Sequence, residues 1–478
     1  MVNDDSCPRR HVCAKLVTVN KGRKEVIVLS INKPVTIGRH PKLCTYVIPD
    51  AFVSNLHCKL YAVRSGTGGI IVSCQDLSTN GLVLNGHMIR RTSVILMHGD
   101  VLEIPSSLTF KCLHIWAEPN DKGNIFDPTP PLQPIQKRVG DYVVTSHCLG
   151  SGSFATVHLA VNKYKHRQVA CKTLKARKGH ELSQVWKEVK ILLSLNHPNI
   201  NRVFDVDQNG NFLHIFLELC TGGDLFTYII SHQETENRLC EGEAKYIMFQ
   251  LLKGLTYLHD KLISHRGMRI SLVITGDTIN LYMSLDIKPE NILLYTPGPY
   301  PRIQIADFGL ARPKAYQETL NVCGTVSYLP PEGILALDNK HLGYVGMPSD
   351  CWSAGVILFI MLSGFHPFDY DASSDSDWLE VVPDSQEPDL QQVTQCSQVS
   401  QGYARNENRV KQRILSGEIE FKDSIWRNLP HARDLVGRLL IRSPLNRGTV
   451  YSSMQSAWIA DDLPALDAAY FDRVLAGP

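Results

Sequence analysis

The chain has 478 residues, which is enough for two or three domains of about 150 residues each. Its 49 basic and 47 acidic residues leave a formal charge of +2, which gives no electrostatic support for direct nucleic-acid binding. The 13 cysteines include no Cys-x-x-Cys pair, so we predict neither a zinc site nor a disulfide framework and expect a reducing compartment.

Two segments bear on membrane contact. Residues 1–10 are polar and lack the apolar core of a signal peptide. The longest apolar run, Val356–Leu362, is too short to span a bilayer and predicts a buried helix. We therefore expect a soluble intracellular protein that does not bind membranes.

After an N-terminal tail at 1–14, residues 15–116 are predicted to form an all-β sandwich. Short apolar segments, such as 26–31, 69–73 and 82–84, alternate with turn sequences. Many short strands at close spacing are typical of two packed sheets.

Three loop motifs follow one another in this region: Ile37-Gly-Arg39, Ser54-Asn-Leu-His57 and Asp76-Leu-Ser-Thr-Asn-Gly81. In this order they resemble the forkhead-associated (FHA) domain, a β-sandwich whose loops bind phosphothreonine peptides. A phosphate dianion matches a guanidinium fork together with neutral donors. The resemblance implies that these groups come from Arg39, Ser54, Asn55, Thr79 and Asn80.

Three other residues of the same motifs are more simply explained by structure. We expect Gly38, Gly81 and His57 to shape or support the loops without touching the ligand. Residues 117–141 then become polar and proline-rich, which predicts a semi-rigid linker without secondary structure.

A glycine-rich segment opens the next predicted domain. Glycine lets backbone N–H groups approach nucleotide phosphates because no Cβ intervenes. The third glycine of the usual pattern is replaced by alanine, a small departure. The segment consists of Leu149, Gly150, Ser151, Gly152, Ser153, Phe154, Ala155, Thr156 and Val157.

A lysine and a glutamate follow at positions where they could form an ion pair. Lys172 ends the apolar strand 169–172, where a merely solvated lysine is not expected. Glu188 lies on a helix predicted from apolar residues at helical spacing between 182 and 192.

The most informative stretch is Asp286-Ile-Lys-Pro-Glu-Asn-Ile-Leu-Leu294, with Ala306-Asp-Phe-Gly-Leu-Ala311 after it. Phosphoryl transfer needs a carboxylate at the accepting hydroxyl, which Asp286 can supply, and Lys288 can reach the transferring phosphate. Asn291 and Asp307 carry the oxygen ligands that Mg²⁺ prefers. These motifs resemble the catalytic core of eukaryotic protein kinases.

The resemblance implies a bilobal α+β kinase domain at 142–459 that uses ATP and Mg²⁺. It implies that Lys172 pairs with Glu188 and that Glu218 and Cys220 lie in the hinge that binds adenine through its backbone. Further residues then acquire roles by position. Asp224 and Glu290 would bind an arginine upstream of the target Ser or Thr.

The activation segment of such a domain would run from Asp307 to Glu332. Thr319 and Thr325 are its candidate phosphorylation sites, and added phosphate there would pair with Arg266. A threonine at the position of Thr325 is often a fixed structural hydroxyl in the family, which favours Thr319. A residue near the end of the domain is also expected to contact the activation segment. Arg447 is predicted to be the buried partner of Glu332.

Two insertions interrupt the domain. Residues 371–408 are rich in Asp, Ser and Gln and are predicted to be disordered. Their Ser-Gln and Thr-Gln pairs resemble targets of the DNA-damage sensor kinases, although chance pairing explains them equally well. These pairs begin at Ser385, Thr394, Ser397 and Ser400.

The second insertion, residues 267–285, separates His265-Arg266 from Asp286, which the family joins as His-Arg-Asp. One explanation is a β-hairpin around Thr275-Gly-Asp277 that bulges from the catalytic loop. The other, which we favour, is a translated intron. Codons for Gly267-Met268 can contain a donor-like GTATG, codons for Leu285-Asp286 can contain an acceptor TAG, and removal of the intervening nucleotides restores the motif.

An FHA domain before a calmodulin-dependent-type kinase domain resembles the fungal DNA-damage checkpoint kinases and their meiotic relatives, and does not separate the two branches. The resemblance implies a serine/threonine kinase of the nucleus, with the cytoplasm as a second location, that is recruited to a phosphothreonine adaptor, where neighbouring copies phosphorylate one another. The alternative is a phosphopeptide-binding scaffold whose kinase domain is inactivated by the insertion at 267–285. Residues 460–478 are assigned to a C-terminal tail.

Overall fold

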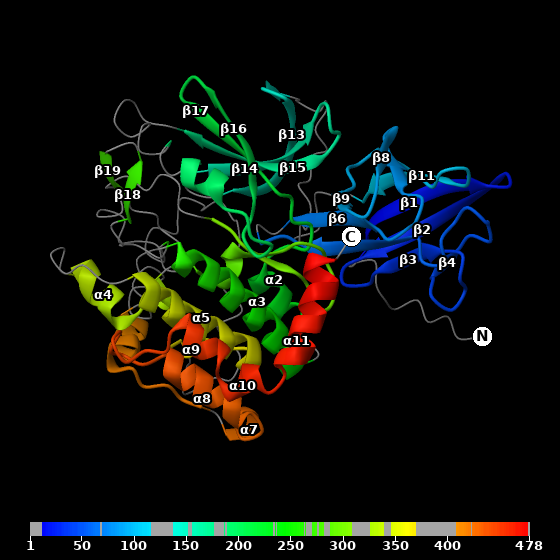
Figure 1. The fold of residues 1–478 in the computed structure, drawn as a ribbon. Coiled ribbons are helices and arrows are strands. Elements are labelled where there is room, and N and C mark those ends of the chain that lie inside the picture. The colour runs from blue at the N-terminus through cyan, green and yellow to red at the C-terminus, as the bar shows by residue number, and fades with distance from the viewer. Residues whose placement is uncertain are drawn as a thin grey trace, which may run out of the picture.

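The computed structural model describes residues 12–66, 69–115, 137–151, 155–175, 186, 189–232, 235, 237–261, 263, 270–274, 277–281, 287–307, 326–338, 346–369, 408–421 and 423–476. A β-rich N-terminal domain lies beside a larger domain of two lobes (Figure 1). The upper lobe in this view is mostly sheet and the lower lobe mostly helix. The predicted order, an all-β domain followed by a bilobal α+β domain, is confirmed.

The N-terminal domain is a sandwich of two sheets. Its strands are β1 (Val12–Asn20), β2 (Arg23–Ser30), β3 (Val35–Gly38), β4 (Tyr46–Val47), β5 (Cys58–Arg64), β6 (Ile70–Asp76), β7 (Leu82–Leu84), β8 (His87–Ile89), β9 (Ser93–Ile95), β10 (Val101–Glu103) and β11 (Thr109–His114). One sheet has the order β2-β1-β11-β10-β7-β8 and the other β4-β3-β5-β6-β9. Alternating residues of both sheets, among them Leu16, Leu60 and Phe110, are buried between them, as the alternation of apolar and polar residues predicts.

The N-terminal lobe of the second domain is a six-stranded antiparallel sheet. Its strands are β12 (Lys137–Val139), β13 (Tyr142–Ser151), β14 (Ala155–Asn162), β15 (Gln168–Lys175), β16 (Val203–Asn209) and β17 (Phe212–Leu217). Their order in the sheet is β12-β13-β14-β15-β17-β16.

The first hairpin of this sheet begins before the predicted start of the domain at 142. Val139 pairs with Tyr142 across a two-residue turn, and Gly140 in that turn has φ +53°, which glycine adopts without steric cost. The predicted linker at 117–141 therefore overlaps β12. Residues 117–136 of that linker lie outside the described residues.

The C-terminal lobe is helical around α3 and α5. Its helices are α2 (Leu225–Ile230), α3 (Glu241–Asp260), α4 (Pro331–Asp338), α5 (Gly346–Ser363), α7 (Asp423–Trp426), α8 (Pro430–Leu439), α9 (Val450–Met454), α10 (Ala457–Ala460) and α11 (Leu463–Tyr470), and residues 408–416 are also helical. Shorter elements are the 3₁₀ turns η3 (Pro289–Asn291) and η5 (Val326–Tyr328), the π-turn η7 (Phe471–Leu475), and the strand pair β20 (Ile292–Leu294) and β21 (Ile303–Ile305).

Helix α5 is the apolar core of this lobe. It is long and apolar enough to cross a membrane, but 89% of the apolar window is buried inside the structure. This burial confirms the predicted buried helix at Val356–Leu362 and is what a core helix of a globular domain shows.

The C-terminal residues pack against the domain instead of forming a separate tail from 460. Leu466, Tyr470 and Val474 recur every four residues and are 6%, 6% and 7% exposed. This spacing places them on one face of α11 and its continuation η7, against α3. Lys253 of α3 and Asp467 of α11 also form an ion pair of 3.4 Å.

The insertion at 267–285 contains the predicted hairpin. Strands β18 (Ile270–Ile274) and β19 (Asp277–Leu281) pair antiparallel, with Ile274 opposite Asp277. These strands lie on either side of residues 275–276, which are outside the described residues. The insertion at 371–408 lies outside the described residues up to 407, so its expected disorder and its Ser/Thr-Gln pairs stay predictions.

Candidate functional site

Four of the predicted phosphothreonine-binding residues are joined across three loops of the N-terminal sandwich. The backbone N–H of Arg39 donates to Ser54 O at 2.9 Å, and its guanidinium Nη2 lies 3.5 Å from Asn55 Oδ1. The backbone N–H of Thr79 donates to Ser54 Oγ at 3.2 Å. Asn80 lies next to this group, donating through Nδ2 to the backbone oxygen of Phe52 at 3.1 Å.

These five side chains remain available to a ligand. Arg39, Asn55, Thr79 and Asn80 are exposed, and Ser54 is partly buried. A guanidinium, two hydroxyls and two amides thus meet on one surface, which is the donor set that a phosphate group requires. The three segments that carry them are far apart in sequence, so only the fold brings them together.

The residues expected to support these loops do so. His57 is fully buried, and its Nδ1 accepts a hydrogen bond from Ser54 N at 3.1 Å. Burial lowers the pKa of His57, which keeps the ring neutral and able to accept. A Cβ at Gly38 would lie 2.5 Å from Asn55 O, and Gly81 has φ +86°, so both positions require glycine.

In the second domain, Lys172 and Asp307 meet across the two lobes. Lys172 lies on β15 of the N-terminal lobe with 15% of its side chain exposed, and its Nζ forms an ion pair with Asp307 Oδ1. Asp307 follows β21 of the C-terminal lobe and has φ +54°, a left-handed conformation that is uncommon outside glycine and occurs often at functional sites. The structure thus brings together two predicted site residues 135 positions apart.

The other predicted metal ligand, Asn291, lies beside Asp307. Strands β20 and β21 place Ile292 opposite Ile305, and Ala306 N donates to Asn291 O at 2.8 Å. An amide and a carboxylate oxygen are suited to Mg²⁺, which keeps additional ligands from water and phosphate. Among the described residues no group of three or more His, Cys, Asp and Glu could hold a metal, so a resident metal cage of those residues is not indicated there.

The described parts of the glycine-rich segment end β13 and begin β14. Val157 of β14 is the register partner of Lys172, so the segment and the lysine share one sheet. A Cβ at Gly150 would meet nothing within 4 Å, which leaves its backbone open to a ligand. Leu149, Ser151, Ala155 and Thr156 lie in the same two strands.

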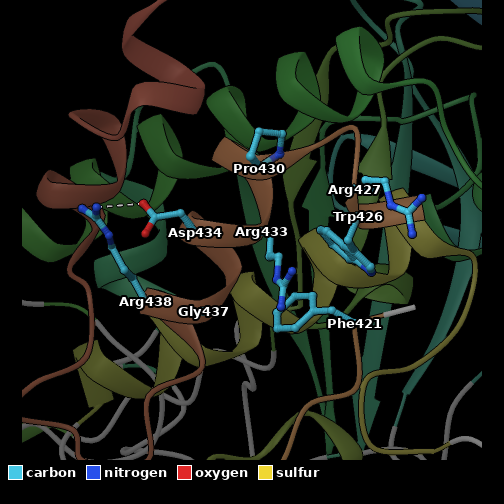
Figure 2. Close-up of a pocket in the computed structure, with 8 residues that line it drawn as sticks. All are labelled: Phe421, Trp426, Arg427, Pro430, Arg433, Asp434, Gly437 and Arg438. Carbon is cyan, nitrogen blue, oxygen red and sulfur yellow. Dashed lines mark ion pairs between the residues drawn. The ribbon is translucent and has the colours of Figure 1, made fainter. Parts of the chain in front are cut away.

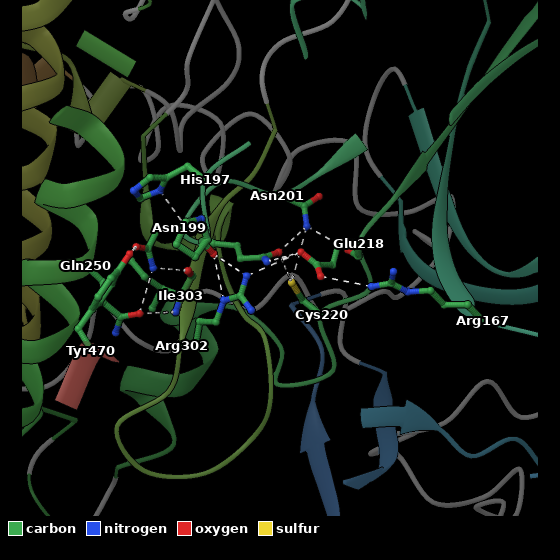
Figure 3. A network of polar contacts seen from close by, with 12 residues as sticks. Arg167, His197, Asn199, Asn201, Glu218, Cys220, Gln250, Arg302, Ile303 and Tyr470 are labelled. Carbon is green, nitrogen blue, oxygen red and sulfur yellow. Dashed lines mark hydrogen bonds and ion pairs between the residues drawn. The ribbon is translucent and has the colours of Figure 1, made fainter. Parts of the chain in front are cut away.

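The hinge after β17 is held by a polar network that the sequence did not predict (Figure 3). Gln304 Nε2 donates to Glu218 Oε2 at 2.7 Å, and the thiol of Cys220 donates to Gln304 Oε1 at 3.2 Å. Asn201 Nδ2 donates to Glu218 O at 3.0 Å and to Gln304 Oε1 at 2.8 Å. Burial raises the pKa of the Cys220 thiol, which keeps it protonated and able to donate.

Gln304 connects this hinge to the metal-ligand candidates. It is fully buried on β21, three residues before Asp307. The other end of the network reaches the C-terminal helix, where Tyr470 OH donates to Asn199 Oδ1 at 2.7 Å (Figure 3). The hinge, the strand leading to Asp307 and α11 are therefore fixed to one another by hydrogen bonds.

The two carboxylates predicted to bind a substrate arginine differ in exposure. Asp224 caps the N-terminus of α2 and accepts from Thr227 N at 2.8 Å and Thr227 Oγ1 at 2.9 Å. Only 6% of Asp224 is exposed, and this burial raises its pKa. Glu290 lies on the neighbouring turn η3 and is exposed. The structure therefore presents one carboxylate of the pair to solvent and covers the other.

Some predicted catalytic and regulatory residues are not yet accounted for. Lys288 is described and precedes η3. The remainder lie outside the described residues: Gly152, Ser153, Phe154, Glu188, Arg266, Asp286, Thr319 and Thr325. Their roles therefore stay predictions.

A surface pocket of about 600 Å³ lies away from these residues, around α7 and α8 (Figure 2). Arg433 places its guanidinium 5.0 Å from the centre of the Phe421 ring, and Arg438 pairs with Asp434 at 2.7 Å. None of the predicted site residues lines it. The pocket thus contributes nothing to the site built here.

Two domain families match the chain. The sequence model of the protein kinase domain matches residues 143–275 and 280–459, and that of the FHA domain matches residues 35–105. The break in the kinase match, 276–279, falls inside the insertion at 267–285.

Three relatives illustrate the similarity. The chain is 32% identical to "Probable serine/threonine-protein kinase fhkC" of Dictyostelium discoideum over 70% of this chain, but spans only 51% of that protein. It is 31% identical to "Probable serine/threonine-protein kinase fhkA" of the same organism, over 91% of this chain and 72% of that protein. It is 29% identical to "Meiosis-specific serine/threonine-protein kinase MEK1" of Saccharomyces cerevisiae, over 95% of this chain and 86% of that protein.

Proposed function

The chain belongs to the protein kinase family, as a serine/threonine kinase that also carries an FHA domain, and from this premise we propose that it phosphorylates proteins to which its FHA domain is recruited. The observation that carries the proposal is the ion pair of Lys172 with Asp307 between the two lobes, with the backbone of Asn291 bonded to the residue before Asp307. Their contact argues for a working transferase more than for an inactive scaffold.

The residues present fit ATP and a divalent cation. Asn291 and Asp307 would hold Mg²⁺, which when bound neutralises charge on the phosphates. When ATP binds, the ammonium of Lys172 would leave Asp307 and contact phosphate oxygens. Glu188 would then be the carboxylate that pairs with Lys172. Asp286 would accept the proton of the substrate hydroxyl, and Lys288 would contact the transferring phosphoryl group. The hinge backbone at Glu218 and Cys220 would hold adenine.

The protein substrate is proposed to carry an arginine upstream of the phosphorylated Ser or Thr. Asp224 and Glu290 supply the two carboxylates, and contacts between α2 and η3 support their proximity. An arginine binds carboxylates through charge-assisted hydrogen bonds, so this pair would select basic sequences.

Recruitment would come from the FHA loops. Arg39, Ser54 and Thr79 would bind phosphothreonine on an adaptor protein, and high local concentration would let neighbouring copies phosphorylate Thr319 or Thr325. This contact between copies would be transient. No direct binding to nucleic acid or membrane is part of the proposal.

Two relatives support a place in checkpoint signalling. The Saccharomyces cerevisiae and Schizosaccharomyces pombe proteins, named MEK1 and mek1, are both described as meiosis-specific kinases, and each aligns with more than nine-tenths of this chain. We propose a nuclear kinase in the meiotic or DNA-damage checkpoint. Damage-sensor kinases would act upstream through the Ser/Thr-Gln pairs at 385–401.

Transfer of labelled phosphate from ATP to a peptide with an upstream arginine tests the proposal. The full chain should phosphorylate this peptide, and Asp307→Ala should reduce the rate by at least about 10²-fold. Binding of a phosphothreonine peptide should be equal in both proteins. Equal rates in the full chain and in Asp307→Ala would show that Asp307 takes no part in the reaction. If the full chain gives no transfer, the same pair of proteins is compared without residues 267–285, and no transfer there as well would contradict a kinase function.

A further inference from the structure

The FHA domain contacts both lobes of the kinase domain around the hinge. Strand β9 lies against β15, where Ile95 N donates to Gln168 Oε1 at 2.7 Å and Gln168 Nε2 donates to Ile95 O at 2.9 Å. On the other side of the hinge, the hydroxyls of Ser93 and Thr221 lie 2.8 Å apart, and Thr221 is fully buried. The same short strand therefore contacts the N-terminal lobe and the start of the C-terminal lobe.

Apolar side chains close the space between these polar contacts. Ile71 and Ile95 of the FHA domain pack with Leu159 and Leu219 of the kinase domain, and all four are less than 9% exposed. The partly buried residues around them, Val63, Met97, Leu149 and Ala170, also come from both domains. Side chains buried in this way resist separation because their apolar surface would return to water.

The hairpin that joins β5 and β6 extends this interface to the edge of the cleft. Ser65 N donates to Gly69 O at 2.8 Å, which closes the hairpin, and Ser65 Oγ donates to Leu149 O at 3.4 Å at the start of the glycine-rich segment. Gly66 lies directly against Asp224, since a Cβ added to Gly66 would be 2.7 Å from Asp224 Oδ2. The hairpin thus touches one edge of the cleft in each lobe.

This position explains why Asp224 is covered. Its carboxylate already accepts two hydrogen bonds from Thr227, and the backbone of Gly66 faces Oδ2. A guanidinium needs space for a planar group with five donors, and a gap too small for one methyl group cannot admit it. An incoming arginine therefore cannot reach Asp224 while the hairpin is in place.

We propose that the described part of this FHA hairpin at Arg64, Ser65 and Gly66 is a built-in cover of the substrate-arginine site, which weakens binding of basic substrates until the FHA domain leaves the hinge. The inference rests on the proposed role of Asp224 in binding arginine. It adds the regulation of that site by another domain of the same chain. Separation of the domains would expose the Asp224 carboxylate and restore selection for arginine.

Two substitutions on opposite sides of the interface test the cover. Gly66→Leu places a side chain where Asp224 leaves no room, and Gln168→Ala removes both hydrogen bonds to Ile95. Gly66 has no left-handed backbone that would itself exclude leucine. Val26→Arg is the matched control, because Val26 is 45% exposed on β2. Binding of a phosphothreonine peptide checks that each variant keeps a folded FHA domain.

The measurement is the affinity of the full chain for two labelled peptides, one with an upstream arginine and one with alanine there. Gly66→Leu and Gln168→Ala should each tighten binding of the arginine peptide by roughly 10-fold or more, the effect of a charge-assisted hydrogen bond, and leave the alanine peptide unchanged. Asp224→Ala in either variant should remove the gain. The Val26→Arg control should match the unmodified chain.

Two results would overturn the cover. One is equal affinity for the arginine peptide in all variants, and the other is a gain that survives Asp224→Ala. If Gly66→Leu loses phosphothreonine binding, Gln168→Ala decides the question by the same criterion, because it changes only the kinase side. Peptide binding needs no phosphoryl transfer, so an inactive chain would contradict the proposed activity without altering the outcome for the cover.

Discussion

Lys172 of the N-terminal lobe forms an ion pair with Asp307 of the C-terminal lobe, and the left-handed backbone of Asp307 turns its carboxylate toward that lysine. Lys172 is mostly buried, whereas 46% of the Asp307 side chain is exposed. A lysine in so apolar a strand is costly unless it has a partner. The pair therefore joins the lobes at the point where ATP phosphates would bind.

Replacing Lys172 should abolish the reaction without affecting recruitment. Lys172→Ala should reduce the initial rate of phosphoryl transfer by about 10²-fold to 10³-fold, because one positive charge near the transferring group is lost. Phosphothreonine-peptide binding should not change. Lys163→Ala is the control, since Lys163 forms an exposed ion pair with Asp141. A rate in Lys172→Ala close to that of Lys163→Ala would place the phosphates elsewhere.

Replacing Arg39 or Ser54 should weaken binding to phosphothreonine. Each of Arg39→Ala and Ser54→Ala should raise the dissociation constant by roughly 10-fold or more, because a hydrogen bond to a charged group is worth about 1.5–3 kcal/mol. Ser54→Ala also removes the acceptor of Thr79 N. Titration with phosphorylated and unphosphorylated peptides measures this. Lys42→Ala, a nearby exposed lysine, should bind normally, and an equal loss there would indicate a general charge effect.

Deleting residues 267–285 tests the interruption of the catalytic loop. The shortened chain should phosphorylate the arginine peptide at least about 10²-fold faster, because a displacement of about 1 Å at Asp286 can cost that factor. Asp286→Ala in the shortened chain supplies the background rate. Equal rates with and without the insertion would mean that the hairpin of β18 and β19 leaves the loop undisturbed, and the intron explanation would lose its support.

Breaking the buried pair between Arg447 and Glu332 should destabilise the C-terminal lobe. The predicted pairing is confirmed, with distances of 2.6 and 2.9 Å between the guanidinium nitrogens and the carboxylate oxygens. Arg447→Met should lower the free energy of unfolding by about 3–5 kcal/mol, because Glu332 is left without its cation. Urea denaturation measures this. Arg438→Met, which breaks the exposed pair with Asp434, should cost less than about 1 kcal/mol, and equal losses would contradict the effect of burial.

Acidification should destabilise the C-terminal lobe through His366. Burial lowers the pKa of His366 to about 3, whereas an unfolded histidine titrates near 6.5. Between these values the unfolded chain binds the additional proton, so stability falls as pH decreases below about 6.5. From pH 7.5 to 5.0 this residue should cost about 2 kcal/mol. Urea midpoints should show a smaller pH dependence in His366→Phe, and an unchanged dependence would show that His366 titrates normally.

Local sequence patterns were sufficient for much of this protein. Alternating apolar residues and turn sequences determine the sandwich, and the phosphothreonine candidates Arg39 and Ser54 lie on loops between its strands. The strand that carries Lys172 depends on neighbours within a few residues. The hairpin at 270–281 was predictable for the same reason. Short-range backbone preferences and spacing determine all of these elements.

Short elements at the two ends of the second domain were not predicted from the sequence. The helix α11 lies in the predicted tail because a segment of eight residues gives a weak helical signal by itself. It is stabilised instead by α3, and by the hydrogen bond of Tyr470 to Asn199. The strand β12 was missed because it is three residues long and depends on its partner β13.

Only the tertiary structure could decide which distant groups meet. Gln304 supports Glu218 across 86 residues, and Gln168 binds the backbone of Ile95 across 73. No local sequence pattern around a glutamine indicates which distant residue it will bind. The cover of Asp224 by Gly66 depends on how two domains pack, which is determined by complementary surfaces. The sequence by itself determined the chemistry of each motif because that chemistry is local, and the fold decided which of these groups a substrate can reach because access depends on every neighbour in space.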